Sequence, residues 1–234
     1  MKPDAYEAWY ESPRGRWIGA VEYRLLASLL DPDPGASLLD VGCGTGHFTR
    51  LFARDVTGVV IGLDSDRDAL TYATTHAAAG ERYVAGAAES LPFPDRSFDF
   101  AVAVTALGFV RRQQEALREL TRVARKRFAL GLLNRHSLLY LTKGRDGGSG
   151  GYHGAHWHTA AEIRSLLAFL PTTNVTLYSA IVLPHGGAFA RVLERCWPQR
   201  ILLGGFLAIS GDLREPGRQP GPSGSNHQAC GEST

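Results

Sequence analysis

The sequence predicts an α/β fold in which a doubly wound, mostly parallel sheet of seven strands is covered by helices on both faces. Short apolar runs alternate with helical patterns over the first 135 residues, which is typical of repeated β-α-β units. Several of these runs are apolar throughout, as expected for strands that are buried on both faces. The 234 residues, 44% of them hydrophobic and 21% charged, suffice for one large domain.

The first part of the chain predicts four strands and two helices. Apolar runs place the strands at residues 37–44, 58–64, 82–87 and 97–107. Apolar residues at helical spacing place the helices at residues 47–55 and 65–80. Ser65 and Asp68 form a capping pattern that marks the start of the second helix, and Asp66 is also placed to cap it.

The second part predicts two further helices and three strands. The helices are expected at residues 114–125 and 159–170, and the strands at residues 127–133, 174–183 and 201–210. Residues 184–200, which separate the last two strands, show no helical pattern. We therefore expect those two strands to pair as an antiparallel hairpin, so that the sheet ends with an antiparallel last strand.

The predicted organisation is a single domain over residues 1–213. Residues 1–30 are expected to form an N-terminal helical cap, and the glycine-rich residues 135–158 a lid-like insertion. Residues 214–234 are rich in Gly, Pro and Ser and almost free of apolar side chains, so we expect a disordered tail there.

Composition excludes several classes of protein. The longest apolar stretches are shorter than the roughly 18 residues of a membrane span, and the first residues lack the pattern of a signal peptide, so we expect a cytoplasmic protein with no membrane span. The three cysteines show no paired spacing, which argues against disulfides or a cysteine zinc site. A net charge of +2 makes a nucleic-acid partner unlikely. No pattern specifies an oligomeric state.

The stretch LLDVGCGTGHFTR, residues 38–50, follows the first predicted strand and carries glycines at alternate positions. In open α/β sheets, ligands bind beyond the carboxyl ends of the strands, next to the first strand. Asp64 ends the second predicted strand 22 residues after Gly42, where an acidic residue can accept hydrogen bonds from both hydroxyls of a ribose. The spacing predicts a nucleoside ligand.

The chemistry of this loop narrows the ligand class. A dinucleotide loop reads G-x-G-x-x-G, whereas here the glycines are Gly42, Gly44 and Gly46. Asp40 lies beside the loop, which is unfavourable for a pyrophosphate and favourable for a cation. No Gly-Lys-Ser/Thr follows, which excludes a P-loop. An adenosine ligand that carries positive charge fits best.

Together, LLDVGCGTG, GLDSD and AAESLPFPDRSFDFAV resemble class I S-adenosylmethionine-dependent methyltransferases, and within them the subgroup of ubiquinone and menaquinone biosynthesis methyltransferases. The resemblance covers roughly residues 38–133 and implies S-adenosylmethionine as the cofactor. It implies that the cofactor is bound by Asp40, Gly42, Gly44, Gly46, Asp64, Ser65, Ala87, Ala88 and Thr105. The family usually has Asp at the position of Ala87, so one hydrogen bond to the adenine is expected to be missing.

Two segments outside these motifs are expected to form the acceptor site. The first is the aromatic N-terminal stretch with Tyr6 and Tyr10, and the second is the end of the glycine-rich insertion with Tyr152 and Trp157. His156 and His158 of that insertion are candidate general bases. Their H-x-x-H-x-H pattern contains no Cys or carboxylate, so no metal site is expected.

The function expected from this resemblance is methyl transfer to a small-molecule acceptor, mainly by proximity and orientation. One alternative is a catalytically silent S-adenosylmethionine-binding regulator or partner subunit. A nicotinamide-dependent oxidoreductase is a second alternative, which the glycine spacing and Asp40 disfavour. Methylation of nucleic acid is a third, and it depends only on the arginines of residues 111–127.

Overall fold

The computed structural model describes residues 2–56 and 58–214. Seven strands form its sheet: β1 (Leu38–Val41), β2 (Val60–Asp64), β3 (Glu81–Ala85), β4 (Phe98–Val104), β5 (Ala124–Leu133), β6 (Thr172–Ala180) and β7 (Phe206–Leu213). The α-helices among the described residues are α1 (Pro3–Glu11), α2 (Pro13–Leu30), α3 (His47–Asp55), α4 (Arg67–Thr75), α5 (Gln113–Val123), α6 (Ala160–Leu167) and α7 (Ala188–Cys196). Three shorter helical segments are η1 (Leu107–Phe109), η2 (Tyr140–Gly144) and η3 (Gly150–Tyr152).

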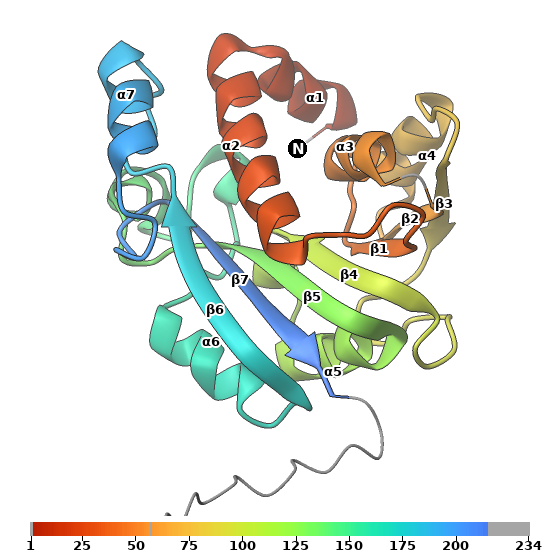
Figure 1. Cartoon of the computed structure of the whole chain (residues 1–234). Coiled ribbons are helices and arrows are strands. Elements are labelled where there is room, and N and C mark those ends of the chain that lie inside the picture. Colours follow the sequence, from red (N-terminus) through yellow and green to blue (C-terminus); the bar gives the residue numbers. More distant parts are fainter. Residues whose placement is uncertain (1, 57, 215–234) are drawn as a thin grey trace, which may run out of the picture.

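The strands lie in the order β3-β2-β1-β4-β5-β7-β6 (Figure 1). Strands β1 to β5 are parallel, whereas β7 lies antiparallel between β5 and β6. The predicted α/β fold with its antiparallel last strand is therefore confirmed. The disordered tail predicted for residues 214–234 lies, from residue 215 on, outside the described residues.

Helices cover both faces of the sheet. Leu26 of α2 and Phe52 of α3 are fully buried against one face, where they join a core with Phe100 of β4. Leu117 of α5 and Ile163 of α6 are fully buried against the opposite face (Figure 1). The near-continuous burial of β1 and β4 follows from this double covering and explains their apolar sequences.

Two helix starts show how local sequence sets the boundaries. The side chain of Asp66 accepts hydrogen bonds from the backbone N–H groups of Asp68 and Ala69, so α4 is capped by Asp66, as its place after Asp64 predicts, and not by Ser65. A two-way capping box between Thr159 and Glu162 starts α6.

Helix α7 corrects the expectation that residues 184–200 contain no helix. Apolar residues do recur at helical spacing from Phe189 to Cys196, but this stripe does not face the core: Phe189 and Val192 are exposed, and Ala190 is the buried residue of the helix. Glu194 attaches the helix to the sheet by accepting hydrogen bonds from the N–H groups of Ile181 and Val182 (2.8 and 3.0 Å). The last two strands nevertheless pair antiparallel, as expected.

Strand β1 lies between β2 and β4, and the chain leaves β1 on one face of the sheet and β4 on the other. A crevice opens at the carboxyl ends of the strands at such a switch point. Within the described part of the chain, no helix is long and apolar enough to cross a bilayer.

Candidate active site

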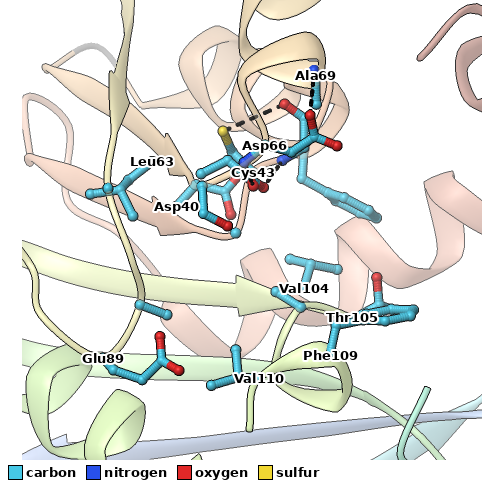
Figure 2. A pocket seen from close by; sticks show the side chains of 18 of the residues that line it. Asp40, Cys43, Leu63, Asp66, Ala69, Glu89, Val104, Thr105, Phe109 and Val110 are labelled. Carbon is cyan, nitrogen blue, oxygen red and sulfur yellow. Dashed lines mark hydrogen bonds between the residues drawn. The ribbon is translucent and has the colours of Figure 1, made fainter. Parts of the chain in front are cut away.

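A cavity of about 820 Å³ lies at the carboxyl ends of β1, β2 and β4 (Figure 2). The glycine loop after β1 forms one wall, and the segment after β4 forms the wall opposite. Side chains of both signs line it, with four carboxyl groups, two arginines and one histidine among them. These are Asp40, Asp64, Asp66, Glu89, Arg111, Arg112 and His47.

Most of the residues predicted to bind a cofactor are brought together here. Those that line the cavity are Asp40, Gly42, Gly44, Asp64, Ser65, Ala88 and Thr105. Gly46 does not line it, because this residue ends the loop against the ring of Tyr83. Ala87 is exposed and outside the lining, whereas Glu89, two residues further on, lines the cavity.

Asp64 holds the loop in shape while facing the cavity. Its Oδ2 accepts a hydrogen bond from the backbone N–H of Gly44 (2.7 Å), and its Oδ1 accepts one from the N–H of Asp66 (2.9 Å). A carboxylate oxygen can accept more than one hydrogen bond, so both oxygens keep capacity for the hydroxyl groups of a ligand.

Asp40 is the most deeply buried acid of the cavity. Its Oδ2 accepts a hydrogen bond from the hydroxyl of Thr49 (2.7 Å), and its Oδ1 is buried without a hydrogen-bond partner. Burial raises the pKa of Asp40 to about 7; the hydrogen bond from Thr49 opposes this rise and the nearby charge of Asp64 adds to it. An unpaired buried oxygen of this kind fits a cationic ligand group, which would supply the missing partner.

Thr105 marks the end of β4 with a strained backbone. Its φ is +55°, a region that β-branched residues rarely adopt. The hydrogen bond from its N–H to the carbonyl of Gly131 (2.7 Å) holds this conformation. Strain of this kind often marks a functional site.

A second cavity of about 190 Å³ adjoins the first and shares Tyr6, Thr105 and Phe109 with it. Its walls are largely apolar and aromatic. They are formed by Tyr6, Trp9, Tyr10, Ile18, Glu22, Thr105, Phe109, Leu133, Leu139, Gly151, Tyr152, Ile181 and Gly205.

Three of the four predicted acceptor-site residues, Tyr6, Tyr10 and Tyr152, line this second cavity. Trp157 does not: it is buried in a separate small cluster with Leu133 and Leu139. Trp157 was expected at the acceptor site because it lies at the end of the glycine-rich insertion. Its indole ring instead packs against the ring of Tyr152.

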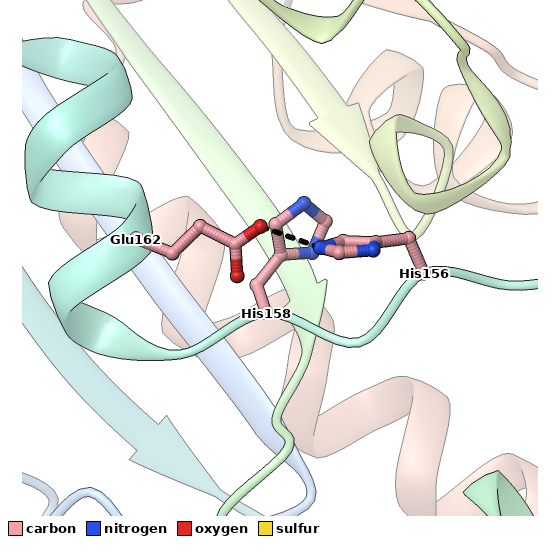
Figure 3. A group of neighbouring side chains, drawn as sticks. All are labelled: His156, His158 and Glu162. Atoms are coloured by element: carbon pink, nitrogen blue, oxygen red, sulfur yellow. Dashed lines mark hydrogen bonds and ion pairs between the residues drawn. The ribbon is translucent and has the colours of Figure 1, made fainter.

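The candidate bases His156 and His158 line neither of the two cavities. They lie together beside Glu162 of α6 (Figure 3). His158 is fully buried, and its Nε2 lies 3.1 Å from Oε1 of Gln113. Burial and the neighbouring His156 lower the pKa of His158 to about 4. His156 pairs instead with Glu162 (2.6 Å), and one ring nitrogen of each histidine and a carboxylate oxygen of Glu162 lie within 4.8 Å of one another.

Glu7 ties α1 to the end of the glycine loop. Its carboxylate accepts hydrogen bonds from the hydroxyl of Thr45 and the guanidinium of Arg50, and the ring of His47 lies 3.9 Å away. Burial alone would raise the pKa of Glu7, but the contacts with His47, Thr45 and Arg50 outweigh it and lower the pKa to about 2. These contacts place Tyr6, one residue earlier, over both cavities.

We expect Glu7→Gln to destabilise the protein at pH 7 by roughly 1–3 kcal/mol, since a carboxyl whose pKa falls from 4.5 to about 2 on folding contributes about that much. The contribution is complete above pH 4.5 and is lost as the pH falls toward 2, because the unfolded chain takes up a proton first. Urea unfolding at pH 7, 5, 4 and 3 should therefore show the two proteins converging. The exposed Glu11→Gln on the same helix is the control, and a difference that does not change with pH would contradict the assignment.

Several cavity residues were missed by sequence reasoning. Phe109 lines both cavities from the short η1, which no periodic pattern marks. Glu22 lines the second cavity from the interior of α2. One signal could have found Glu22, because it lies on the apolar stripe of its helix with Ile18 and Leu25, where a charged residue is out of place.

Comparison with known proteins agrees with this geometry. Residues 39–129 match a family model described as a methyltransferase domain. An uncharacterized protein of Mycobacterium tuberculosis is 35% identical over 169 residues, which are 70% of this chain and 56% of that protein. A demethylmenaquinone methyltransferase of Shouchella clausii is 36% identical over 102 residues, 41% of this chain and 43% of that protein. The chain thus spans about half the length of these curated relatives.

Solved structures show the same fold. A crystal structure from Thermotoga maritima, described as an S-adenosylmethionine-dependent methyltransferase and possible histamine N-methyltransferase, superposes with a TM-score of 0.71 at 22% identity, covering 90% of this chain and 96% of that one. Residues 39–129, which include the glycine loop and strands β1 to β4, thus match the methyltransferase-domain family, and the fold is that of a solved S-adenosylmethionine-dependent methyltransferase.

Proposed function

We propose that the chain transfers a methyl group from S-adenosylmethionine to a small-molecule acceptor. The observation that carries this proposal is the junction of two unlike cavities at Thr105. One is large and lined by carboxyl groups, and the other is small and largely apolar. A cationic nucleoside fits the first, and a compact organic molecule fits the second.

The cofactor would be held by residues of the first cavity. Asp64 would accept hydrogen bonds from the ribose hydroxyls, and the unpaired oxygen of Asp40 would accept one from the ammonium group of the methionine portion. Ala88 and the nearby backbone would contact the adenine edge, with no side-chain hydrogen bond from Ala87. When bound, this cofactor supplies a methyl group on positively charged sulfur.

The chain itself would position the cofactor and the acceptor relative to each other and exclude water from the space between them. Tyr6, Thr105 and Phe109 form walls common to both cavities, so they separate and align what lies on each side. Effective molarities of about 10⁵–10⁸ M are reached by such alignment alone, and methyl transfer needs no further group unless the acceptor carries a proton.

The charges of the first cavity favour this cofactor over a nicotinamide dinucleotide. Asp40, Asp64 and Asp66 surround the glycine loop, where a dinucleotide would place its pyrophosphate. Like charges would oppose that ligand and favour a cationic one.

Thermal unfolding with S-adenosylmethionine, S-adenosylhomocysteine and NAD in parallel tests the cofactor. At about 100 times the dissociation constant, a ligand of the native state stabilises by roughly 2.7 kcal/mol, or about 5–10 °C for this chain length. We expect a shift with both S-adenosyl ligands and none with NAD. A shift with NAD alone would overturn the proposal, and S-adenosyl binding without release of S-adenosylhomocysteine from any acceptor would favour a silent binding protein.

A further inference from the structure

The second cavity contains one carboxyl group in otherwise uncharged surroundings. Among the described residues that line it, Glu22 is the only acidic or basic one apart from the tyrosines. The side chain is 91% buried, since 9% of its surface is exposed, and no described residue forms a hydrogen bond with its carboxyl group. A buried carboxyl without a partner is destabilising, so its presence calls for a ligand that pairs with it.

The aromatic side chains around Glu22 favour an organic cation as its ligand. Four aromatic side chains line the same cavity, namely Tyr6, Trp9, Tyr10 and Tyr152. The rings of Tyr6 and Tyr10 meet edge to face with centroids 5.2 Å apart, and Trp9 meets Tyr10 in the same way at 4.8 Å. Aromatic faces attract organic cations, and a carboxylate pairs with them.

We propose that the second cavity binds a small organic amine as the methyl acceptor, with the amine nitrogen paired to the carboxyl group of Glu22. This inference rests on the proposed function for the transfer step and on the cavity alone for the binding step. The volume of about 190 Å³ is below the roughly 300–1,000 Å³ of sites for drug-sized ligands, so the amine is compact. If the ligand were a carboxylic acid, the cavity would hold two acids without a partner. If it were an alcohol, Glu22 would have no charged partner.

Glu22 also has a chemical role, because an ammonium has no free electron pair. The ammonium gives one proton to the Glu22 carboxylate, which leaves a neutral amine and a carboxylic acid. The amine nitrogen then forms a bond to the methyl carbon as the bond from that carbon to sulfur breaks, and sulfur keeps the electron pair. The methylated amine is again a cation, and Glu22 returns its proton to solvent when product leaves.

Burial favours this proton transfer. Burial raises the pKa of Glu22 to about 8, and the same environment lowers the pKa of a buried amine, so both changes favour the neutral pair. Even with an alkylammonium pKa of about 10.4, transfer to Glu22 is unfavourable by only about 10²-fold, compared with about 10⁶-fold for an ordinary glutamate.

The other titratable groups that line the second cavity are tyrosines, which do not change charge near pH 8, whereas Asp40, whose pKa is raised to about 7, lines the first cavity and acts on Tyr6 through its charge. The tyrosines belong to the elements packed around α2: Tyr6 and Tyr10 on α1, and Tyr152 on η3. Burial raises the pKa of Tyr6 and Tyr152 to about 12, and that of Tyr10 well above its ordinary value. Arg14 acts on Tyr152 through its charge, and His47, stacked on Tyr10, lines the first cavity.

The test is calorimetric binding of matched amine and alcohol pairs, with and without saturating S-adenosylhomocysteine. Three pairs of increasing size are used: butylamine and butanol, benzylamine and benzyl alcohol, and 2-phenylethylamine and 2-phenylethanol. We expect at least one amine to bind ten times more tightly than its alcohol. Its affinity should rise by close to tenfold per pH unit below pH 8, where binding expels a proton, and level off above it.

The variant Glu22→Gln should abolish both the preference for the amine and its pH dependence, and it should fold well because it removes an unpaired buried acid. Glu11→Gln, which changes an exposed acid of α1, should leave both unchanged. Equal binding of amine and alcohol in every pair, or a preference that survives Glu22→Gln, would overturn the inference. The thermal shift with S-adenosylhomocysteine in the same samples separates this failure from a failure of the proposed function.

Discussion

Asp64→Ala is expected to weaken binding of S-adenosylhomocysteine at least about 100-fold and to remove its thermal shift. The substitution takes away a carboxylate that would accept two hydrogen bonds from a ribose, and hydrogen bonds to a charged group contribute roughly 1.5–3 kcal/mol each. It also takes away the acceptor for the N–H of Gly44, so the loop loses its support. Calorimetric titration of S-adenosylhomocysteine into both proteins measures the effect.

The matched control for Asp64 is Asp68→Ala, which removes an equal charge from the exposed first turn of α4. We expect this variant to bind within about twofold of the wild type, because Asp68 does not line the cavity. If Asp64→Ala folds and binds S-adenosylhomocysteine within threefold of the wild type, Asp64 does not contact the ribose and the assignment of the cavity is wrong.

Gly42→Ala is expected to destabilise the protein by roughly 2–5 kcal/mol, or about 5–15 °C in melting temperature. At φ +76° a side chain is strained, and the added Cβ would lie 2.3 Å from the Cβ of Ala106 on the facing segment. Gly44→Ala is the matched control, since Gly44 also has a positive φ (+54°) but nothing lies within 4 Å of its added Cβ. There only the backbone strain remains, roughly 1–2 kcal/mol.

Thermal unfolding without ligand compares the two glycine variants directly. Equal losses of stability would mean that backbone conformation alone explains both glycines. A larger loss for Gly42→Ala would show that the loop must approach the segment after β4 closely, which is the contact that shapes the large cavity.

The fold and the cofactor side of the site follow from local sequence. Strand β1, the glycine loop and Asp64 are contiguous motifs, and parallel topology brings their carboxyl ends together. Helix α7 was missed although its apolar residues recur at helical spacing; the stripe faces solvent, and one buried alanine and the carboxylate of Glu194 attach the helix to the rest of the fold.

The acceptor side depends on tertiary packing that spacing does not encode. His156 and His158 follow a glycine-rich segment and resemble loop residues, yet the backbone of His158 pairs with Leu133 and Asn134 and carries its ring into the interior. Glu22 reaches the second cavity because α2 packs against β5 and β7 on one face of the sheet and α1 packs against α2. Contacts between distant segments decide both positions.

Helix α1, nine residues long and tethered through Glu7, is a common wall of both cavities because Tyr6 lines each of them. A displacement of this helix would open the two cavities in one event. Ligands of the two cavities would then share an exit, and the contacts of Glu7 with Thr45 and Arg50 would couple their release.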